Sequence, residues 1–344
     1  MKCVLLSGPT AAERIELTDC PVPKVQPGWV LVKVRAFGLN HSEQVLRLDE
    51  ISYDYIPKPI IPGIECAGEI ADPSDSAFHK GQKVVALMGG MGRSFNGSYA
   101  EYALLPADHV FAADTGLSWA ELAAVPETWF TAWGSLFEGL QLEAIDTLLI
   151  RGATCALGYA AMQIAKAAGA TVIATTHREE KLPLLEGADQ AVLDTGTLQG
   201  SLAGVSKVLE LIGAKTLRDS LQIPERGGIV CHTGILGGVY GLNQFDPIKE
   251  IPNGVYLTGF FSNYPTQETM DSIFRFQSDH AVEPRIGAIY DFDDIRQALV
   301  DIDNHRTDGK IVVVVDSDDR KLRAAAEAAG STRRHVFSSP RLPV

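Results

Sequence analysis

The sequence predicts an α/β protein of two domains, in which a doubly wound parallel sheet is inserted into a β-rich domain. Three observations predict this fold. The chain has 344 residues, more than one hydrophobic core usually serves. Its first part alternates apolar and polar positions in short runs broken by Gly and Pro, which is typical of antiparallel strands. From Asp146 to about Phe261, continuous apolar runs are separated by helical patterns, which is typical of a parallel sheet covered on both faces.

The β-rich domain is expected to begin with residues 1–123, in segments such as WVLVKVRAFGLN, KVVALMGG and SYAEYALLP. A helical stretch follows from Ser118 to Gly139, where Ser118 can cap the start and Pro126 interrupts the helix. We expect the parallel sheet within residues 124–264, with strands at DTLLIRGA, ATVIATT, QAVLDT, KVLELIG, GGIVCHTG and VYLTGFF.

The last part of the chain returns to the first domain. TQETMDSIFRFQSD has a helical pattern, and EPRIGAIYDF and KIVVVVD have strand patterns. Residues 265–316 are therefore expected to complete the β-rich domain. Residues 317–344 are polar, Ala-rich and then rich in Arg, Ser and Pro, and we expect a loosely held tail there.

Composition excludes several classes of partner. Hydrophobic residues make up 46% of the chain and charged residues 21%, so it is expected to fold. Its 30 Lys and Arg against 43 Asp and Glu give a net charge of −13, which repels nucleic acid and anionic lipid surfaces. No window reaches the apolar run that a membrane span needs. We expect neither nucleic acid nor membrane as a partner.

Cysteine usage bears on the cellular compartment. The number of cysteines is odd and no CxxC pair occurs, so we expect free thiols in a reducing compartment. The amino terminus lacks the long apolar region of a secretory signal, and a cytoplasmic location is expected. The five cysteines are Cys3, Cys20, Cys66, Cys155 and Cys231.

The segment LLIRGATCALGYAAMQIAKAAGATVIATT predicts one complete βαβ unit with a small-residue turn from Gly152 to Gly158. Small residues allow the backbone to approach a pyrophosphate, and the helix amino end then offers unpaired N–H groups and partial positive charge. The GxGxxG fingerprint is not literally present, because Ala156 stands where the middle Gly would be, so a merely tight structural turn is the alternative. The residues expected to bind the dinucleotide here are Gly152, Ala153, Thr154, Ala156, Leu157 and Gly158.

The end of the second strand of this unit favours NADP(H) over NAD(H). An NAD site usually has Asp or Glu at this point. Here the chain has Thr176, His177 and Arg178, with Lys181 one turn further on. Hydroxyl, guanidinium and ammonium groups suit a 2′-phosphate, and Arg binds phosphate in a bidentate manner. The alternative is that the two cations are solvated and open the next helix.

Further glycines lie at the carboxyl ends of later predicted strands, where ligands bind in open α/β sheets. Gly213 follows LELI, and Thr233 and Gly234 end the CHTG segment. We expect the cofactor to lie across these strand ends. The alternative is that these glycines simply end their strands.

Taken together, the motifs resemble those of the medium-chain dehydrogenase/reductase superfamily, particularly its zinc-independent quinone oxidoreductase branch. The likeness covers roughly residues 1–316. It rests on FGLNHSE, PGIECAGEI, GSYAEYALLP, the TAW at Thr131, the turn at Gly152–Gly158 and DGKIVV, in this order. The resemblance implies a GroES-like catalytic domain with an inserted Rossmann domain and a cofactor in the cleft between them.

The resemblance also argues against a catalytic metal. Alcohol dehydrogenases of this superfamily hold zinc through a Cys after a first-domain strand and a His in a GHE motif. The corresponding residues here are Asn40 and Ile64, an amide and an apolar side chain that do not suit zinc. No cysteine lies between Cys66 and Cys155, so the lobe for a structural zinc is missing. His41, Glu43, Glu65 and Cys66 do not make a convincing substitute, and no metal is expected.

The resemblance places several residues at the expected nicotinamide end of the cleft. Asn40 matches an Asn beside the nicotinamide, and its amide would donate to the developing oxyanion; a strand-ending turn residue is the alternative. Thr131 and Lys310 match residues near the cofactor. The alternatives are a Thr131 hydroxyl that bonds its own helix backbone and a Lys310 that is a surface cation. Phe260 and Phe261 follow the last Rossmann strand, where the resemblance implies the lining of the nicotinamide pocket. The alternative is that they are generic core aromatics.

Proton donors are less clearly indicated. Tyr53, Tyr55 and His41 are candidates, because residues 47–62 border the expected cleft. This segment is rich in Tyr, Ile and Pro, which suits an apolar wall against a flat acceptor and equally a packed surface loop.

These patterns predict an NADPH-dependent, zinc-independent oxidoreductase that transfers hydride to a small, hydrophobic, electron-poor quinone or α,β-unsaturated carbonyl. Such acceptors need no Lewis acid, since conjugation carries the charge to oxygen. The alternatives are a zinc-type alcohol dehydrogenase with an unrecognised metal site and a non-catalytic NADP(H)-binding structural or regulatory protein. The resemblance implies a homodimer, paired edge to edge around VYLTGFF.

Overall fold

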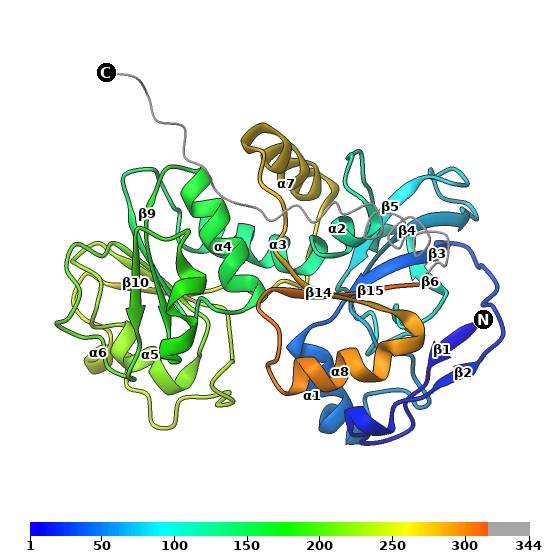
Figure 1. Ribbon diagram of the computed structural model, residues 1–344, viewed down its shortest axis with the longest axis horizontal. Helices are drawn as coiled ribbons and strands as arrows, with labels where there is room; N and C mark the ends of the chain where they lie inside the picture. Colours follow the sequence, from blue (N-terminus) through cyan, green and yellow to red (C-terminus); the bar gives the residue numbers. More distant parts are fainter. Residues whose placement is uncertain (316–344) are drawn as a thin grey trace.

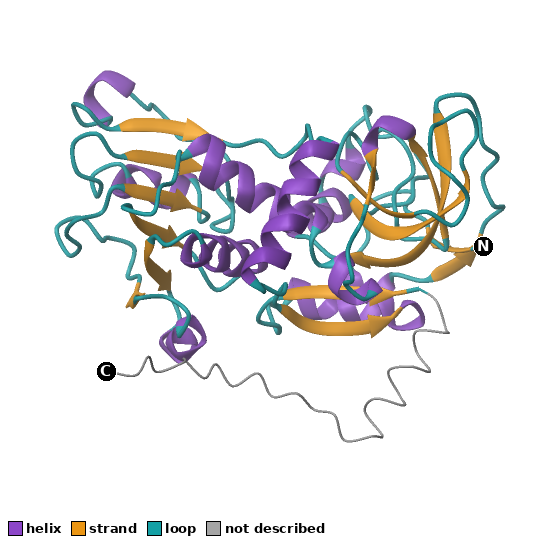
Figure 2. Cartoon of the chain, turned by 90° about the horizontal axis from the view of Figure 1, so that it is seen from above, coloured by secondary structure: helices purple, strands orange, loops and turns teal. Residues whose placement is uncertain are grey.

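The computed structural model describes residues 1–315, and the predicted tail at 317–344 lies outside this part. Two sheets organise the molecule and lie on opposite sides of a central group of helices (Figures 1 and 2). One has six strands in the order β10-β9-β8-β11-β12-β13, and the other has seven, with β14-β15-β3-β4-β5-β7 in line and β6 beside β3. The predicted α/β fold, with a parallel sheet inserted into a β-rich domain, is confirmed.

The six-stranded sheet is wholly parallel, and its order is the doubly wound order of dinucleotide-binding folds. Each predicted strand is present. The central strands are buried on both faces, which explains their unbroken apolar runs. The six strands are β8 (Thr147–Arg151), β9 (Thr171–Thr176), β10 (Gln190–Leu193), β11 (Lys207–Glu210), β12 (Ile229–His232) and β13 (Tyr256–Gly259).

Its outer parts depart from the expected buried strands separated by helical segments. The edge strands β10 and β13 are half-exposed or exposed along their whole length. Between β9 and β10 the chain forms only the 3₁₀ helix η5 (Glu179–Leu185), because Pro183 prevents a regular α-helix. The loop from β10 to β11 has no α-helix and contains three glycines with positive φ. The α-helices of this part are α4 (Ala156–Ala167), α5 (Ala214–Ser220) and α6 (Pro247–Glu250).

The seven-stranded sheet joins both ends of the described chain. The strands β14 and β15 come from the carboxyl-terminal segment, and β15 pairs antiparallel with β3. The hairpin β1–β2 lies beside this sheet (Figure 1). The strands of the hairpin are β1 (Lys2–Val4) and β2 (Leu17–Asp19). The strands of the seven-stranded sheet are β3 (Trp29–Gly38), β4 (Glu65–Asp72), β5 (Lys83–Leu87), β6 (Tyr102–Pro106), β7 (Val110–Ala112), β14 (Ile286–Asp291) and β15 (Lys310–Val314).

The predicted helical stretch from Ser118 to Gly139 forms three consecutive segments: α2 (Trp119–Ala123), α3 (Pro126–Trp133) and the π-helix η4 (Gly134–Gly139). Ser118 caps α2, and Pro126 opens α3, as expected. A core built on Trp129, Leu136 and Ile164 continues from these helices into both sheets. The stretch is therefore a packed joint between the two parts. The remaining helices are η1 (Ala12–Arg14), α1 (His41–Leu48), η2 (Glu50–Ser52), η3 (Ala107–His109), α7 (Gln267–His280), η6 (Phe292–Asp294) and α8 (Ile295–Asp303).

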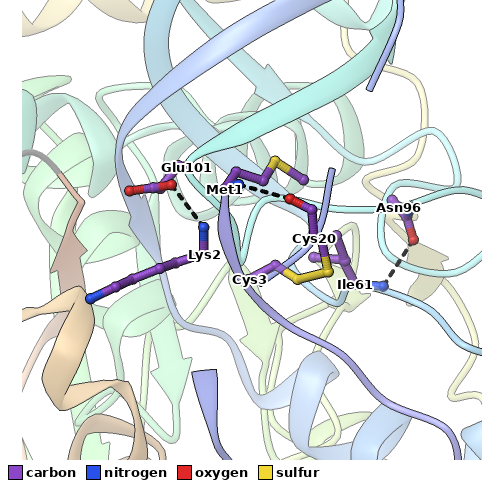
Figure 3. The surroundings of a disulfide bond; sticks show 7 residues. All are labelled: Met1, Lys2, Cys3, Cys20, Ile61, Asn96 and Glu101. Atoms are coloured by element: carbon purple, nitrogen blue, oxygen red, sulfur yellow. Dashed lines mark hydrogen bonds between the residues drawn. A yellow bond between two sulfur atoms is a disulfide. The ribbon is translucent and has the colours of Figure 1, made fainter. Parts of the chain in front are cut away.

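The expectation of five free thiols is wrong for two of them. Cys3 and Cys20 form a disulfide with Cα atoms 6.5 Å apart (Figure 3). Antiparallel pairing of β1 with β2 brings them together, since Cys3 lies opposite Thr18 and the Met1 ammonium donates to the Cys20 carbonyl at 2.7 Å. The thiols of Cys66, Cys155 and Cys231 are free. The compartment argument therefore no longer rests on an absence of disulfides.

Within the described residues, no helix has the length and apolar character needed to cross a lipid bilayer.

Candidate functional site

A cavity of about 380 Å³ lies between the two sheets, at the carboxyl ends of the parallel strands. Both parts of the molecule contribute to its walls, and apolar side chains cover most of the lining, as is usual for sites of organic ligands. Ten of the predicted site residues line it: Asn40, Thr131, Thr154, Ala156, Leu157, Lys181, Thr233, Gly234, Phe260 and Phe261.

The small-residue turn forms the nucleotide side of the cavity. Gly152, with φ 85°, directly follows β8, and Ala153 is fully buried. A Cβ atom on Gly158 would lie 2.3 Å from the carbonyl oxygen of Ala153, so only glycine allows α4 to start this close to the strand. Cys155 caps α4 by accepting a hydrogen bond from the Gly158 N–H at 3.3 Å. The amino end of α4 therefore opens on the cavity.

The polar groups at the end of β9 lie beside this turn. Thr176 Oγ1 is 3.2 Å from Thr154 Oγ1 and accepts from the Arg178 N–H at 3.3 Å. Arg178 Nε contacts His177 Nε2 at 3.4 Å near the surface, and neither side chain lines the cavity. Lys181 lines it and forms an ion pair with Asp308 at 2.6 Å. The end of β9 carries no carboxylate.

The tops of β11, β12 and β13 form the floor. Gly213, with φ 101°, packs against the Gly234 carbonyl oxygen, which a Cβ would approach to 2.8 Å. Thr233 Oγ1 is 2.9 Å from Ser135 Oγ, which joins the floor to the π-helix η4. Phe260 packs edge-on against Phe130, whereas Phe261 is 69% exposed at the rim.

The opposite wall contains a buried polar cluster that we call the Lys310 network: Lys310, Asn40, Glu65, Thr128, Glu43 and Glu127. The Lys310 ammonium is 2.6 Å from Glu65 Oε1 and 2.6 Å from Asn40 Oδ1, and it donates to Thr128 Oγ1 at 2.8 Å. Gly38 makes room for this pair, since a Cβ there would meet Lys310 Cε at 2.3 Å. Lys310 is 2% exposed, which excludes the alternative of a surface cation.

Asn40 differs from the sequence expectation. Its side-chain Nδ2 donates to Glu65 at 2.8 Å and to Glu43 at 3.4 Å, while its Oδ1 accepts from Lys310. Both amide hydrogens therefore face carboxylates, and neither is left for an oxyanion in the cavity. Asn40 caps α1 and holds the network together, so it serves as a buried link.

Three glutamates share this one lysine. Glu65 also accepts from the Glu127 N–H at 2.8 Å, and Glu43 accepts from the Ile64 N–H at 3.1 Å. Burial, reinforced by the charge of Glu65, raises the pKa of Glu43 to about 7. Burial also raises the pKa of Glu127, against the opposing effect of Lys310, and Glu65 raises it further.

Glu127 is a residue that sequence reasoning missed. It is half-buried, lines the cavity and accepts from the Thr131 hydroxyl at 2.9 Å. The contact explains the predicted Thr131, whose hydroxyl bonds a side chain one turn earlier, not its own backbone. The i, i+4 spacing of Glu and Thr in PETWFT was the signal available in the sequence.

The predicted proton donors lie differently from expectation. Tyr53 is 46% exposed, donates to Asp49 at 3.1 Å and stacks on Tyr55, and neither tyrosine lines the cavity. Within residues 47–62 only Glu50 lines it, so the apolar wall comes from other segments. His41 lines the cavity, and burial lowers its pKa. A role for Tyr53 stays a prediction.

Among the described residues, no group of three or more His, Cys, Asp and Glu side chains is arranged to hold a metal ion. Ile64 is buried, and Asn40 and Glu65 are bonded to the Lys310 ammonium.

Comparisons with known proteins agree with this architecture. Residues 26–115 match the alcohol dehydrogenase GroES-like domain, and residues 186–313 match the zinc-binding dehydrogenase family. The chain is 30% identical over 300 residues to the quinone oxidoreductase of Rattus norvegicus, covering 83% of this chain and 88% of the relative.

Two solved structures share the fold. The crystal structure of AibC has a TM-score of 0.82 at 25% identity, covering 91% of this chain and 95% of that one. An NAD-dependent alcohol dehydrogenase has a TM-score of 0.78 at 26% identity, covering 92% of this chain and 100% of that one. The fold and the site define a nicotinamide-dependent oxidoreductase. The chain belongs to the medium-chain dehydrogenase/reductase superfamily, in its quinone oxidoreductase-like branch.

Proposed function

We propose that the chain is an NADPH-dependent, zinc-independent reductase that transfers hydride to quinones or α,β-unsaturated carbonyls. The observation that carries this proposal is the two-sided cavity. One wall is a nucleotide turn, and the other holds an ammonium bonded to Asn40 and Glu65. The quinone oxidoreductase of Rattus norvegicus supports the acceptor class.

The residues fit a bound dinucleotide. Gly158 allows α4 to start close to β8, the α4 amino end attracts a pyrophosphate, and Lys181 lines the same cavity. Thr176 and Arg178 at the end of β9 suit a 2′-phosphate, where a carboxylate would repel it. The fold alone does not choose between cofactors, because one similar structure is NAD-dependent.

The reduced nicotinamide supplies a hydride when bound. The protein's part is to orient the acceptor and exclude water. Leu157, Leu236 and Phe260 line the cavity with apolar surface that suits a flat acceptor. Thr131 and Glu127 are among the polar groups that line the opposite wall.

Binding and turnover test the proposal together. Purified protein is titrated with NADPH and with NADH, and cofactor oxidation is then followed by absorbance with a panel of quinones and enones. We expect tighter NADPH binding and NADPH oxidation with at least one acceptor class. Stronger NADH binding would overturn the cofactor assignment, and NADPH binding without turnover on any acceptor would overturn the reductase assignment.

A matched pair of variants locates the 2′-phosphate site. Arg178→Ala is expected to weaken NADPH binding about tenfold and leave NADH binding unchanged, as for the loss of one charge-assisted contact. Arg275→Ala, at an exposed position on α7, is the control and should change neither. Equal weakening of both cofactors by Arg178→Ala would contradict the assignment.

We propose a homodimer formed along β13 in the cytoplasm. β13 is an unpaired edge of the parallel sheet within the described residues, and exposed aromatic side chains lie in it and after it, with Tyr256 59%, Phe261 69% and Tyr264 76% exposed. Analytical ultracentrifugation should give twice the chain mass, and Tyr256→Lys should shift the protein toward monomer. A monomeric wild-type protein at micromolar concentration would contradict the dimer.

A further inference from the structure

We propose that the Glu127 carboxyl donates the proton that completes reduction of the acceptor, with Thr131 holding it in the donating orientation. This inference rests on the proposed function, which left the proton unassigned. The step adds no new reactant, because the hydride of the reduced nicotinamide brings both electrons of the proposed reaction.

The two carboxyl oxygens of Glu127 differ in their hydrogen bonds. Oε1 accepts from the Thr131 hydroxyl at 2.9 Å, which suits the carbonyl oxygen of a neutral carboxyl group. Within the described residues no donor contacts Oε2, although the side chain lines the cavity. The free oxygen is thus the one available to carry the proton.

The surroundings of this carboxyl group favour its neutral form. The charged and titratable groups that face it are Glu65 on β4, Lys310 on β15 and Cys155 at the start of α4. The Lys310 ammonium forms an ion pair with Glu65, so the Glu65 carboxylate offsets much of its charge. Burial raises the pKa of Glu127, and the nearby Glu65 carboxylate adds to the rise.

The chemistry balances. Hydride addition leaves negative charge on the oxygen of a quinone or enone. The O–H bond at Glu127 Oε2 then breaks and an O–H bond forms on the acceptor, which gives a hydroquinone or an enol. The resulting Glu127 carboxylate, for which the site provides one hydroxyl donor, recovers a proton from solvent through the open cavity.

Acceptor basicity gives the sharpest test. The variant is Glu127→Gln, which preserves size and the Thr131 contact, and the control is Glu138→Gln at an exposed position on η4. With an enone, whose enolate is strongly basic, Glu127→Gln should lower kcat about 100-fold at pH 7. With a chlorinated benzoquinone, whose hydroquinone anion is weakly basic, the loss should be under tenfold. Glu138→Gln should behave as wild type with both.

Two further readouts separate a proton donor from a structural residue. Wild-type kcat with the enone should fall as pH rises through the raised pKa of Glu127, and this decline should vanish in Glu127→Gln. Without cofactor or acceptor, the infrared difference between wild type and Glu127→Gln at pH 7 should contain the band of a protonated carboxyl group. Cofactor affinity should change less than twofold.

The outcomes are distinguishable. If the wild type reduces neither acceptor, the proposed function fails and this inference falls with it. If the wild type is active and Glu127→Gln keeps enone turnover within threefold, only the proton donor is overturned. Equal losses with both acceptors, with weaker cofactor binding, would make Glu127 structural and also overturn the inference.

Discussion

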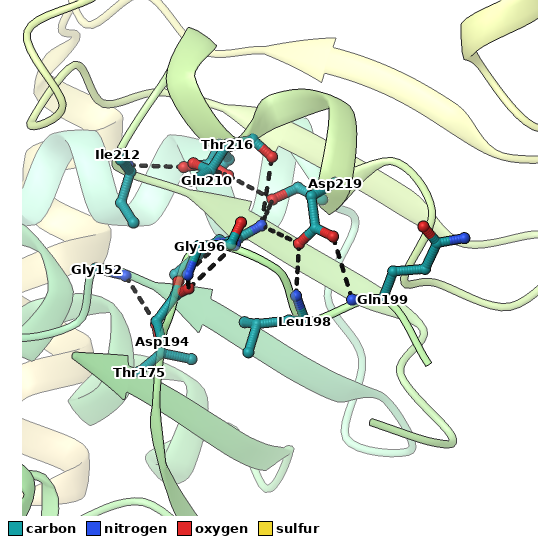
Figure 4. A network of polar contacts seen from close by, with 12 residues as sticks. Gly152, Thr175, Asp194, Gly196, Leu198, Gln199, Glu210, Ile212, Thr216 and Asp219 are labelled. Carbon is teal, nitrogen blue, oxygen red and sulfur yellow. Dashed lines mark hydrogen bonds and ion pairs between the residues drawn. The ribbon is translucent and has the colours of Figure 1, made fainter. Parts of the chain in front are cut away.

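The protein buries two ionic networks, one in each part of the molecule, and they use their carboxylates differently. In the nucleotide part, Arg151 at the end of β8 is fully buried and bonds Asp194 and Asp219, each at 2.7 Å. Figure 4 labels both aspartates and the neighbouring Glu210. We call this group, with Glu210 and Ser220, the Arg151 network. It joins the ends of β8 and β11 to α5 and does not line the cavity.

Every carboxylate oxygen of the Arg151 network has a donor. Glu210 accepts from the N–H groups of Ile212 and Gly213 at 2.7 and 2.9 Å and from two hydroxyls of α5. Asp194 and Asp219 accept from backbone N–H groups as well as from Arg151. Such a network has no free site for a substrate, and we assign it to holding strand ends in place.

The Lys310 network has fewer donors for its carboxylates and borders the cavity. Glu65 and Glu43 are bonded at both oxygens, whereas Glu127 has one donor and one free oxygen. The comparison teaches that burial alone does not mark a functional carboxylate. An unpartnered oxygen on a side chain that lines a cavity does.

The largest loss of unfolding free energy is expected from Arg151→Met. It removes five donors and leaves Asp194 and Asp219 without their buried cation, which costs about 3–5 kcal/mol of unfolding free energy. Chemical denaturation of wild type and variant measures it. A loss below about 1 kcal/mol would mean that backbone donors alone support these carboxylates.

Lys310→Met should cost a similar amount, about 3 kcal/mol, but with a strong pH dependence. Lys310 lowers the pKa of both Glu43 and Glu127, so its removal raises both further. Carboxyls with raised pKa values destabilise the folded state more as pH rises, so the loss should be larger at pH 8 than at pH 5. Denaturation at the two pH values measures it, and equal losses would contradict the shared-cation description.

Glu43→Gln should flatten the pH dependence of wild-type stability. The pKa of Glu43 is about 7 in the folded protein against 4.5 when exposed, so the unfolded chain releases this proton first. The contribution is fully present below pH 4.5 and is lost as pH rises to 7, by about 3 kcal/mol. The measurement is the change in unfolding free energy between pH 5 and pH 8. Equal changes in wild type and variant would contradict a neutral Glu43.

The sequence predicts the fold well because local patterns specify it. The strands β8, β9, β11 and β12 read as apolar runs, and Pro126 and Ser118 mark real helix starts. It could not predict the Cys3–Cys20 disulfide, because an odd cysteine count without a CxxC pair does not exclude one pair joined by a hairpin.

The site was predicted in outline, since the turn and strand ends have local signatures. The Lys310 network depends on contacts between distant segments, and no local pattern specifies those. One signal was present: Lys310 begins a strand that is otherwise Ile and Val, and a lysine in a buried strand needs a buried partner. That reasoning leads to Glu65 in PGIECAGEI, whose neighbourhood with His41, Glu43 and Cys66 suggests only a poor metal site.

The smallest stability effect is expected for Glu127→Gln, and its match in the other network is Glu210→Gln. At Glu210 all four hydrogen-bond partners are donors. The amide NH₂ of a Gln side chain would therefore face a donor, and that donor would lose its acceptor, at a cost of about 1–3 kcal/mol. At Glu127 the Gln oxygen can keep the Thr131 bond while its NH₂ takes the free position toward the cavity, so the change should stay within about 0.5 kcal/mol. Thermal unfolding of both variants beside wild type measures the difference. If Glu127→Gln were as destabilising as Glu210→Gln, Oε2 would have a partner that the contacts do not show, and the contrast between the two networks would disappear.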